Sequence, residues 1–130
     1  VFTGPIHERD MVAVYRSCNA FFLVSNAGKG MGEGLPLTPL EAMACAKPVL
    51  VGDQDGSREI LAGGGGLCSS PDDVDGQAAY VMKLERDREF RTFEEAAARD
   101  RVVGAFTYRE FRSNTERVFK PLLSRGPERS

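Results

Sequence analysis

Glu33-Gly-Leu-Pro-Leu-Thr-Pro-Leu-Glu41, which runs directly into Ala-Met-Ala-Cys, sets two carboxylates eight positions apart across the junction between a loop and a helix. Thr38 is the predicted N-cap residue of that helix, and Pro39 takes its first position, where the missing N–H costs nothing. Glu41 falls three residues after Thr38, which completes a capping-box pattern. The Gly30–Pro36 segment before it is too rich in glycine and proline for a regular helix or strand. We therefore expect a loop that leads into a helix N-terminus, whose unpaired N–H groups and positive dipole end suit a phosphate or diphosphate.

Short apolar runs alternate with longer amphipathic stretches along the whole chain, which predicts parallel strands linked by crossover helices. The expected strands lie near Val1–Thr3, Ala20–Ser25, Pro48–Gly52 and Gly65–Ser69. The expected helices cover about Glu8–Ser17, Pro39–Ala46, Ser57–Leu61, Asp72–Glu85, Arg88–Val103 and Tyr108–Leu123. The apolar runs within the second and third strands lack polar alternation, as strands covered on both faces do. The pattern indicates an α/β fold with a parallel sheet flanked by helices.

The composition is that of one ordinary globular domain. The chain has 130 residues, of which 42% are hydrophobic and 28% charged, and this length excludes two full domains. We expect the domain to cover residues 1–124 and residues 125–130 to form a frayed tail. A net charge of −2 gives no electrostatic case for a nucleic-acid partner.

Targeting signals and cysteine frameworks are missing from the sequence. No run approaches the roughly 20 apolar residues of a membrane span, and no leader pattern opens the chain, so the cytoplasm is the expected location. Cys18, Cys45 and Cys68 are odd in number and lack C-x-x-C spacing, which indicates neither a disulfide framework nor a zinc site. We interpret them as small buried hydrophobic residues.

The Glu33–Glu41 stretch resembles the Glu-x7-Glu signature of retaining glycosyltransferases of family 4, whose C-terminal domain commonly reads Glu-Gly-(apolar)-(Gly/Pro)-Leu-x-x-(apolar)-Glu-Ala-Met-Ala. Other segments resemble further motifs of that family, in the right order: Val1–Tyr15 ("V-x-F-x-G…L-x-x-x-Y"), Ala20–Ser25 ("D-x-F-x-x-P-S"), Ala46–Val51 ("GKPVV"), Asp53–Ile60 ("D-x-GG-x-x-E") and Gly66–Asp73 ("GxAGLLV-x-P-D-D"). The resemblance covers the chain from Val1 to about Phe111. Linked segments in order are more specific than a single Glu-x7-Glu match.

The resemblance implies a fold and a reaction. The fold would be a Rossmann-like parallel sheet, part of the C-terminal, donor-binding domain of a GT-B transferase. The reaction would be retaining transfer of a hexose-like sugar from a UDP-, GDP- or ADP-sugar to an acceptor bound by an N-terminal domain that is absent here. A chain whose first residue lies in a predicted core strand is expected to be a truncated fragment or an unusual gene product. Because the absent part usually carries the Arg/Lys pair on the donor diphosphate, we expect the fragment alone to be inactive.

By resemblance, the two glutamates have separate roles. Glu41 would bind the ribose hydroxyls, since an ionised carboxylate accepts two hydrogen bonds from adjacent hydroxyls. Glu33 would touch the donor sugar and help to stabilise positive charge that develops at its anomeric carbon. Neither is assigned as a nucleophile, because the double displacement of hydrolases does not carry over to these enzymes. Two plainer interpretations stay open: Glu41 as the return arm of a capping box, and Glu33 as a solvated loop residue.

Backbone groups complete the expected donor site. The N–H groups of Gly34 and Leu35, with those that open the helix at Thr38, would face the diphosphate or the donor sugar. Gly4, Pro5 and Ile6, just past the first expected strand, would contact the base, mostly through backbone atoms. The resemblance implies neither a cofactor nor a metal, because the helix N-terminus and the absent basic residues could neutralise the diphosphate.

Other polar residues receive plainer interpretations. Lys29 is a tempting phosphate ligand, but it lies in a loop longer than the family's usual spacing, and that departure bears on donor-sugar choice. His7, the sole histidine, is expected at the surface or at the start of a helix. Asp53 and Asp55 are predicted turn formers; a magnesium site of the receiver type would need a further acidic cluster and a placed lysine. Gly63–Gly66 lacks the G-x-G-x-x-G continuation of a dinucleotide site and predicts a turn before a strand.

A second hypothesis comes from another functional class. The chain could be a non-catalytic α/β nucleotide-binding or protein-interaction module that keeps this fold, because fold alone does not fix function. Nucleotide binding would distinguish the two. The base, the transferred sugar and the acceptor are not specified by these residues.

Overall fold

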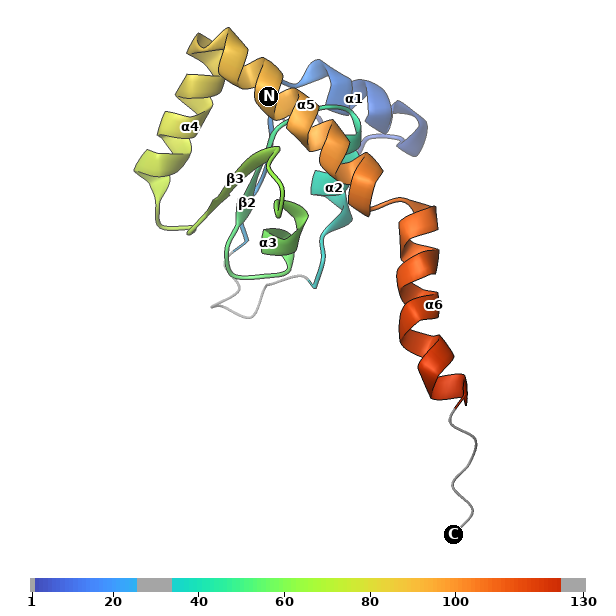
Figure 1. The fold of residues 1–130 in the computed structure, drawn as a ribbon. Helices are drawn as coiled ribbons and strands as arrows, with labels where there is room; N and C mark the ends of the chain where they lie inside the picture. The colour runs from blue at the N-terminus through green and yellow to red at the C-terminus, as the bar shows by residue number, and fades with distance from the viewer. Residues whose placement is uncertain (1, 26–33, 125–130) are drawn as a thin grey trace.

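The structure, a computed structural model, describes residues 2–25 and 34–124. Figure 1 shows strands at the centre with helices around them and one helix extending away. In chain order the elements are the 3-10 turn η1 (Glu8–Asp10), α1 (Met11–Ser17), β1 (Phe21–Leu23), α2 (Leu37–Ala44), β2 (Val49–Gly52), α3 (Ser57–Ile60), β3 (Gly66–Ser69), α4 (Val74–Arg86), α5 (Arg88–Ala105) and α6 (Tyr108–Ser124). None of the helices in the described part of the chain combines the length and apolarity needed to cross a membrane.

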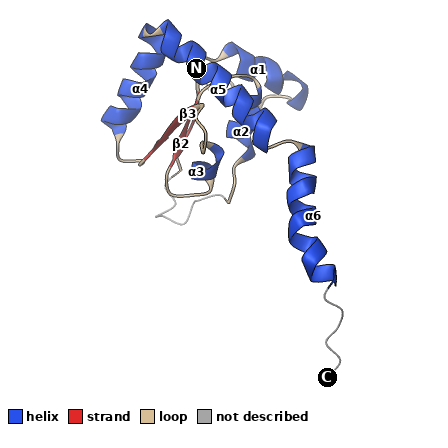
Figure 2. Ribbon diagram, viewed as in Figure 1, coloured by secondary structure: helices blue, strands red, loops and turns tan. Residues whose placement is uncertain are grey.

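The three strands form one parallel sheet in the order β1-β2-β3. Leu50, at the centre of β2, pairs with Phe22 on one side and Leu67 on the other. Every residue of β2 is buried, as expected for a strand between two neighbours and covered on both faces. Figure 2 shows the sheet surrounded by helices, which confirms the α/β fold with a flanked parallel sheet.

The core gathers around β2 and the helices that follow β1 and β2. Its buried members come from α1, α2, β2, α3 and α5: Tyr15, Ala42, Met43, Val49, Val51, Ile60 and Ala98. Burial of such side chains contributes roughly 1.5–3 kcal/mol for each large one, so this cluster is the main source of stability. It also fixes α1 and α2 side by side, which matters for the site described below.

Helix α2 ends in a Schellman motif. Ala46 has a φ of 57° in the left-handed region, its N–H donates to the Met43 carbonyl at 2.9 Å, and the Lys47 N–H donates to the Ala42 carbonyl at 3.0 Å. Glycine is usual at such a position because it lacks the Cβ that makes this conformation costly. The chain therefore carries backbone strain at Ala46.

Two arginines of α5 donate hydrogen bonds to the last carbonyls of two earlier helices. The Arg99 guanidinium donates to the Ala44 carbonyl at the end of α2. Arg101 donates through Nε to the Ile60 carbonyl at 2.9 Å and through Nη2 to the Glu59 carbonyl at 2.7 Å, at the end of α3. The last carbonyls of a helix have no partner within it, so these arginines stabilise α2 and α3 and tie them to α5.

A buried acid links α5 to its surroundings. Glu94 is only 8% exposed, and its Oε2 accepts a hydrogen bond of 3.2 Å from the Tyr80 hydroxyl of α4. Burial raises the pKa of Glu94, although Tyr80, backbone hydrogen bonds from Gly66 and Gly65, and the Lys83 charge act in the opposite direction. This carboxylate holds α4, α5 and the start of β3 together.

Helix α6 extends away from the rest of the described structure (Figure 1) and has exposed apolar side chains, among them Phe111, Phe119 and Leu122.

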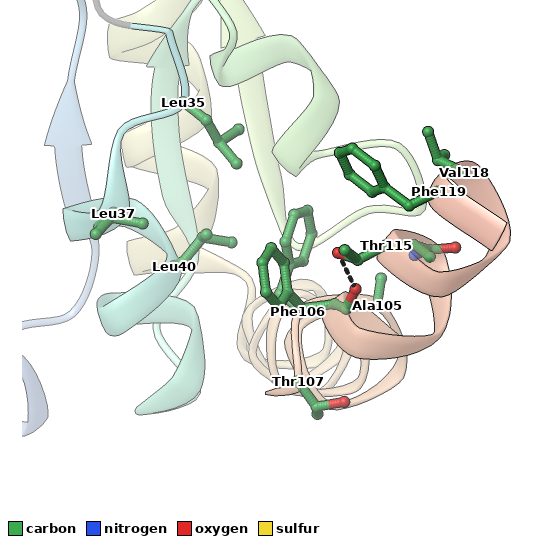
Figure 3. A pocket seen from close by; sticks show the side chains of 11 residues that line it. Leu35, Leu37, Leu40, Ala105, Phe106, Thr107, Thr115, Val118 and Phe119 are labelled. Atoms are coloured by element: carbon green, nitrogen blue, oxygen red, sulfur yellow. Dashed lines mark hydrogen bonds between the residues drawn. The ribbon is translucent and has the colours of Figure 1, made fainter. Parts of the chain in front are cut away.

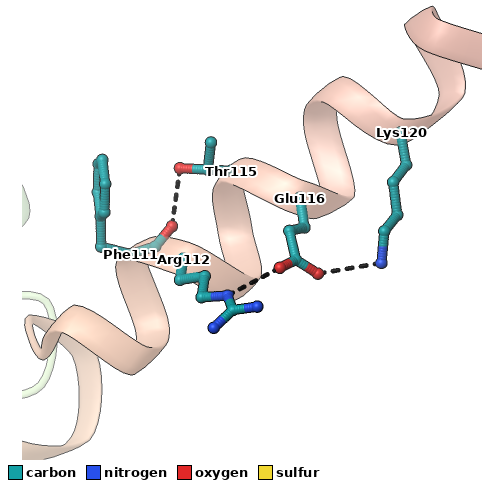
Figure 4. A network of polar contacts seen from close by, with 5 residues as sticks. All are labelled: Phe111, Arg112, Thr115, Glu116 and Lys120. Atoms are coloured by element: carbon teal, nitrogen blue, oxygen red, sulfur yellow. Dashed lines mark hydrogen bonds and ion pairs between the residues drawn. The ribbon is translucent and has the colours of Figure 1, made fainter.

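On the surface of α6, Glu116 accepts hydrogen bonds from Arg112 at 2.9 Å and Lys120 at 3.0 Å, each one helical turn away (Figure 4). Ion pairs this exposed contribute little to stability.

Two predictions, of a strand at the start of the chain and of buried cysteines, are wrong. No strand forms at Phe2–Thr3, whose side chains are exposed, because no strand among the described residues pairs with this segment; Val1 lies outside them. The three cysteines are half-buried and free rather than buried. Cys18 and Cys68 lie against backbone carbonyls, of Tyr15 and Gly52 respectively.

The predicted start of α2 is also wrong. The helix begins at Leu37, after Pro36 in an extended conformation with φ −70° and ψ 135°, and no side chain caps it. Thr38 is thus the second helical residue, and Pro39 the third rather than the first. Thr38 does not act as the cap because the chain is already helical at Leu37, directly after the extended Pro36. Pro39 is still tolerated, since the first turn has no use for its N–H.

Candidate functional site

The segments that follow β1 and β2 meet at the carboxyl edge of the sheet. A Cβ on Gly52, the last residue of β2, would lie only 3.0 Å from the Ser25 carbonyl oxygen, which follows β1. Because the strands are parallel, the start of α2 and the turn after β2 reach the same edge. Open α/β sheets bind their ligands at this edge.

The loop before α2 rests directly on that turn. A Cβ on Gly56 would overlap the carbonyl group of Gly34, so the two backbones touch with no side chain between them. The Asp55 carboxylate accepts a hydrogen bond of 2.8 Å from the Ser57 N–H, which shapes the turn, as predicted for an aspartate in that position. The turn therefore supports the exposed Gly34–Leu35 backbone.

The first turn of α2 follows immediately. Two of the positions that lack an intrahelical hydrogen bond, Pro36 and Pro39, are prolines without an N–H, so Leu37 and Thr38 carry the amide donors at this end. Thr38 is exposed. Amide donors and the positive dipole end at a ligand-binding edge suit an anion.

Glu41 lies about 4.5 Å further along α2, at a rise of about 1.5 Å per residue. Its side chain is exposed, and its Oε2 accepts a hydrogen bond of 2.8 Å from the hydroxyl of Tyr15 on α1. The Tyr15 ring is 5% exposed and packs edge-on against Phe21, with ring centroids 5.7 Å apart. Burial and the hydrogen bond to Glu41 raise the pKa of Tyr15 above its ordinary value, so its hydroxyl remains a donor.

A hollow of about 380 Å³ opens beside this pair, between α1 and α2. Its walls are Glu8, Met11, Val12, Tyr15, Glu41, Ala44 and Cys45. Among the described residues, two carboxylates and no basic side chain face it, which favours ligand groups that donate hydrogen bonds over phosphate oxygens. Apolar side chains on the same walls suit a flat or aliphatic ligand part.

A larger groove of about 540 Å³ runs between α2 and the α5–α6 junction. Figure 3 shows its side chains, which are Leu35, Leu37, Leu40, Ala105, Phe106, Thr107, Phe111, Asn114, Thr115, Val118 and Phe119. None of the described residues that line it is titratable, so they offer apolar contact but no group for chemistry. The candidate site is accordingly the smaller hollow, which Glu41 lines, together with the first turn of α2 that precedes Glu41.

The sequence profile of the family described as glycosyl transferases group 1 matches residues 1–101. The chain belongs to the group 1 glycosyltransferases. The GDP-mannose-dependent monoacylated α-(1-6)-phosphatidylinositol monomannoside mannosyltransferase of Corynebacterium glutamicum is 29% identical over 82% of this chain and 29% of its own length. The O-antigen chain mannosyltransferase B of Escherichia coli is 31% identical over 69% of this chain and 22% of its own length.

The phosphatidyl-myo-inositol mannosyltransferase of Mycolicibacterium smegmatis is 30% identical over 78% of this chain and 25% of its own length. The chain thus spans less than a third of each of these relatives. Membership of the group 1 glycosyltransferases is consistent with the parallel sheet and with a helix that begins at its carboxyl edge and carries an exposed acid.

The structure of this group 1 glycosyltransferase chain brings together part of the predicted site. Gly34, Leu35 and Thr38 lie along the same loop and first helical turn that lead to Glu41. Glu33 and Lys29 lie outside the described residues. Gly4, Pro5 and Ile6 precede η1, whose Glu8 lines the hollow, but they are not among its wall residues.

The remaining polar candidates have structural roles. His7 is exposed and accepts a hydrogen bond of 3.3 Å from the Arg9 N–H at the start of η1, as predicted for the start of a helix. The glycines before β3 form a turn with positive φ at Gly63, Gly64 and Gly65. Within residues 2–25 and 34–124, no three His, Cys, Asp or Glu side chains are arranged to hold a metal ion.

The sequence did not predict that Tyr15 donates a hydrogen bond to Glu41, because Tyr15 was considered only as part of the family motif. A physical signal was present. Tyr15 follows Met11 by one helical turn, so both face the sheet, and a buried tyrosine hydroxyl needs a hydrogen-bond partner. The partner, Glu41, is 26 residues away in the sequence and could not be identified from spacing.

Proposed function

We infer that this chain is the nucleotide-sugar-binding part of a retaining, family 4-like glycosyltransferase with the GT-B arrangement. The observation that carries the proposal is Glu41: an exposed carboxylate that accepts a hydrogen bond from Tyr15, in a helix whose first turn lies at the carboxyl edge of a parallel sheet. Membership of the group 1 family makes a glycosyl donor the natural ligand for such an acid.

In this proposal the donor lies along the first turn of α2. Ribose hydroxyls donate to Glu41 in the acidic hollow, and the diphosphate approaches the amides of Leu37 and Thr38, with the Gly34 and Leu35 backbone beside them. Gly4–Ile6 lie toward the base. Glu33 would stand at the donor sugar, where a carboxylate stabilises positive charge at the anomeric carbon as the bond to the diphosphate breaks. The acceptor hydroxyl forms the new bond on the same face and gives its proton to the departing diphosphate, so configuration is retained.

The names of the relatives suggest which donor to test first. All three are mannosyltransferases, and one name specifies GDP-mannose. We therefore propose a hexose, with GDP-mannose as the leading candidate donor and UDP- and ADP-sugars as comparisons.

The acceptor would be bound by a further part of the protein that this chain does not contain. The apolar face of α6, with Phe111, Phe119 and Leu122 exposed, supports the idea that another surface covers it. A longer chain should show slower hydrogen exchange in α6 than the 130-residue chain; equal exchange would contradict this arrangement.

Calorimetric titration of the chain with GDP, UDP and ADP tests the donor site. We expect selective binding of one nucleotide and, in Glu41→Ala, an affinity lower by roughly 10-fold or more, because hydrogen bonds to a charged group are lost. Glu89→Ala, which removes an exposed glutamate from the first turn of α5, is the matched control and should bind like the wild type.

Two results would count against the proposal. Absence of binding at millimolar nucleotide would favour the protein-interaction module. Equal affinity in Glu41→Ala and the wild type would remove Glu41 from the site while leaving nucleotide binding intact.

A further inference from the structure

The Tyr15–Glu41 contact is unusual for a pair on neighbouring helices, because its two partners have opposite environments. The tyrosine ring is buried in the core against Phe21, whereas the glutamate is exposed to the hollow. An exposed glutamate ordinarily samples several rotamers, and fixing it has an entropic cost. Here a buried, rigid donor holds it at 2.8 Å.

The contact uses only part of the carboxylate. Tyr15 donates to Oε2, and an ionised carboxylate has about four acceptor sites on its two oxygens. Oε1 and the second lone pair of Oε2 therefore remain for a ligand. With one oxygen held in place, the plane of the carboxylate is also restricted, which is the condition for accepting two hydrogen bonds from adjacent hydroxyls of a ring.

The protonation of Tyr15 keeps the direction of these bonds fixed. Its hydroxyl stays protonated because burial opposes its ionisation, so it always donates to Glu41 and leaves the ligand's hydroxyls to donate to the same carboxylate. The walls of the hollow that residues 2–25 and 34–124 form add a second carboxylate, Glu8, and no cation. The chemistry selected at this point is a pair of hydroxyl donors rather than a phosphate.

We propose that Tyr15 is a positioning residue that orients the Glu41 carboxylate for the two ribose hydroxyls of the nucleotide. The inference rests on the proposed function and deepens it, because it says how the same chain can tell a ribonucleotide from one that lacks these hydroxyls. In this proposal Tyr15 acts through Glu41, which alone of the two binds the hydroxyls. Its effect appears as selectivity, which a purely structural tyrosine would not change.

The test compares GDP with 2′,3′-dideoxy-GDP by calorimetry, in the wild type and in Tyr15→Phe, which removes only the hydroxyl. We expect the wild type to bind GDP about 10-fold more tightly than the dideoxy nucleotide, as for loss of hydrogen bonds to a charged group. In Tyr15→Phe this ratio should fall to about 3-fold or less, while affinity for the dideoxy nucleotide stays within about 2-fold of the wild type. The double variant Tyr15→Phe/Glu41→Ala should bind GDP no more weakly than Glu41→Ala alone.

Tyr80→Phe is the matched control, because it removes the hydroxyl from the other tyrosine–glutamate pair, 3.2 Å from Glu94 and away from the hollow. It should leave the ratio unchanged. If the wild type prefers GDP and Tyr15→Phe keeps that preference, the inference is wrong and the proposed function stands. If the wild type binds both nucleotides equally or neither, the proposed role of Glu41 fails first, and the inference falls with it.

Discussion

The two tyrosine–glutamate pairs have the same chemistry and opposite surroundings. In each, a tyrosine hydroxyl donates to a glutamate Oε2 and the tyrosine ring lies edge-on to a phenylalanine, Phe21 for Tyr15 and Phe90 for Tyr80. Glu94 is buried and has further partners in the Gly66 and Gly65 backbone. Glu41 is exposed beside a hollow. A carboxylate surrounded by protein donors serves the fold, whereas one held from a single side is free to bind a ligand.

The largest expected effect is a difference in the free energy of unfolding between variants of the two glutamates. Glu94→Ala leaves the Tyr80 hydroxyl and the glycine N–H groups without their acceptor in a buried place, which should lower the free energy of unfolding by about 3 kcal/mol. Glu41→Ala should lower it by about 1 kcal/mol or less, because water in the hollow can replace the carboxylate. Urea unfolding of both variants measures the difference. Equal losses would mean that both acids are structural.

The second prediction concerns pH. Burial raises the pKa of Glu94 in the folded chain above its unfolded value of about 4.3. Between these two values the folded chain binds the proton more tightly, so the free energy of unfolding falls as the pH rises from about 4.3 through the raised pKa. Glu116 should act in the opposite direction, because Lys120 and Arg112 lower its pKa, but it lies at the surface, where water and salt screen these charges and its effect is small.

Glu94→Gln isolates the contribution of Glu94 to the pH dependence of stability. We expect this variant to lose the part of the pH dependence above about 4.3 that Glu94 causes, whereas Glu41→Gln should keep it. Denaturant titrations at several pH values provide the measurement. An unchanged slope in Glu94→Gln would show that other groups cause the dependence.

The smallest predicted effect is a gain in stability at the end of α2, the helix that carries Glu41. Ala46→Gly, at the left-handed end of the helix that carries Glu41, should raise the free energy of unfolding by about 0.5–1 kcal/mol because it relieves the positive φ. Nucleotide affinity should not change. A lower melting temperature would mean that the loss of chain entropy outweighs the relieved strain, and altered affinity would mean that Ala46 acts on the site.

The sequence was sufficient for the α/β fold and for most elements, because apolar runs and amphipathic stretches depend on local spacing. β2 and α5 lie within two residues of their expected bounds. The start of α2 was wrong because two rules competed: Thr38 satisfied the capping pattern, but Pro36 had already set an extended residue from which the helix could begin. The expected first strand failed because pairing, not composition, makes a strand.

For the candidate site, the sequence identified Glu41 through its motif but not what holds it. The Tyr15–Glu41 and Tyr80–Glu94 bonds join residues 26 and 14 positions apart, and which acid is exposed depends on packing by helices elsewhere in the chain. The motif also could not show that Gly56 lies against Gly34. Such contacts follow from tertiary structure, which spacing along the sequence does not reveal.

The arginines of α5 have a consequence for synthesis of the chain. The carbonyls of Ala44 and Ile60 bind side chains 55 and 41 residues later. At about 5–20 residues per second, a ribosome needs a few to about ten seconds to make the intervening residues. During that interval the first half of the domain has incomplete helix ends and an uncovered central strand, so the nascent chain is a natural client for chaperones until α5 emerges.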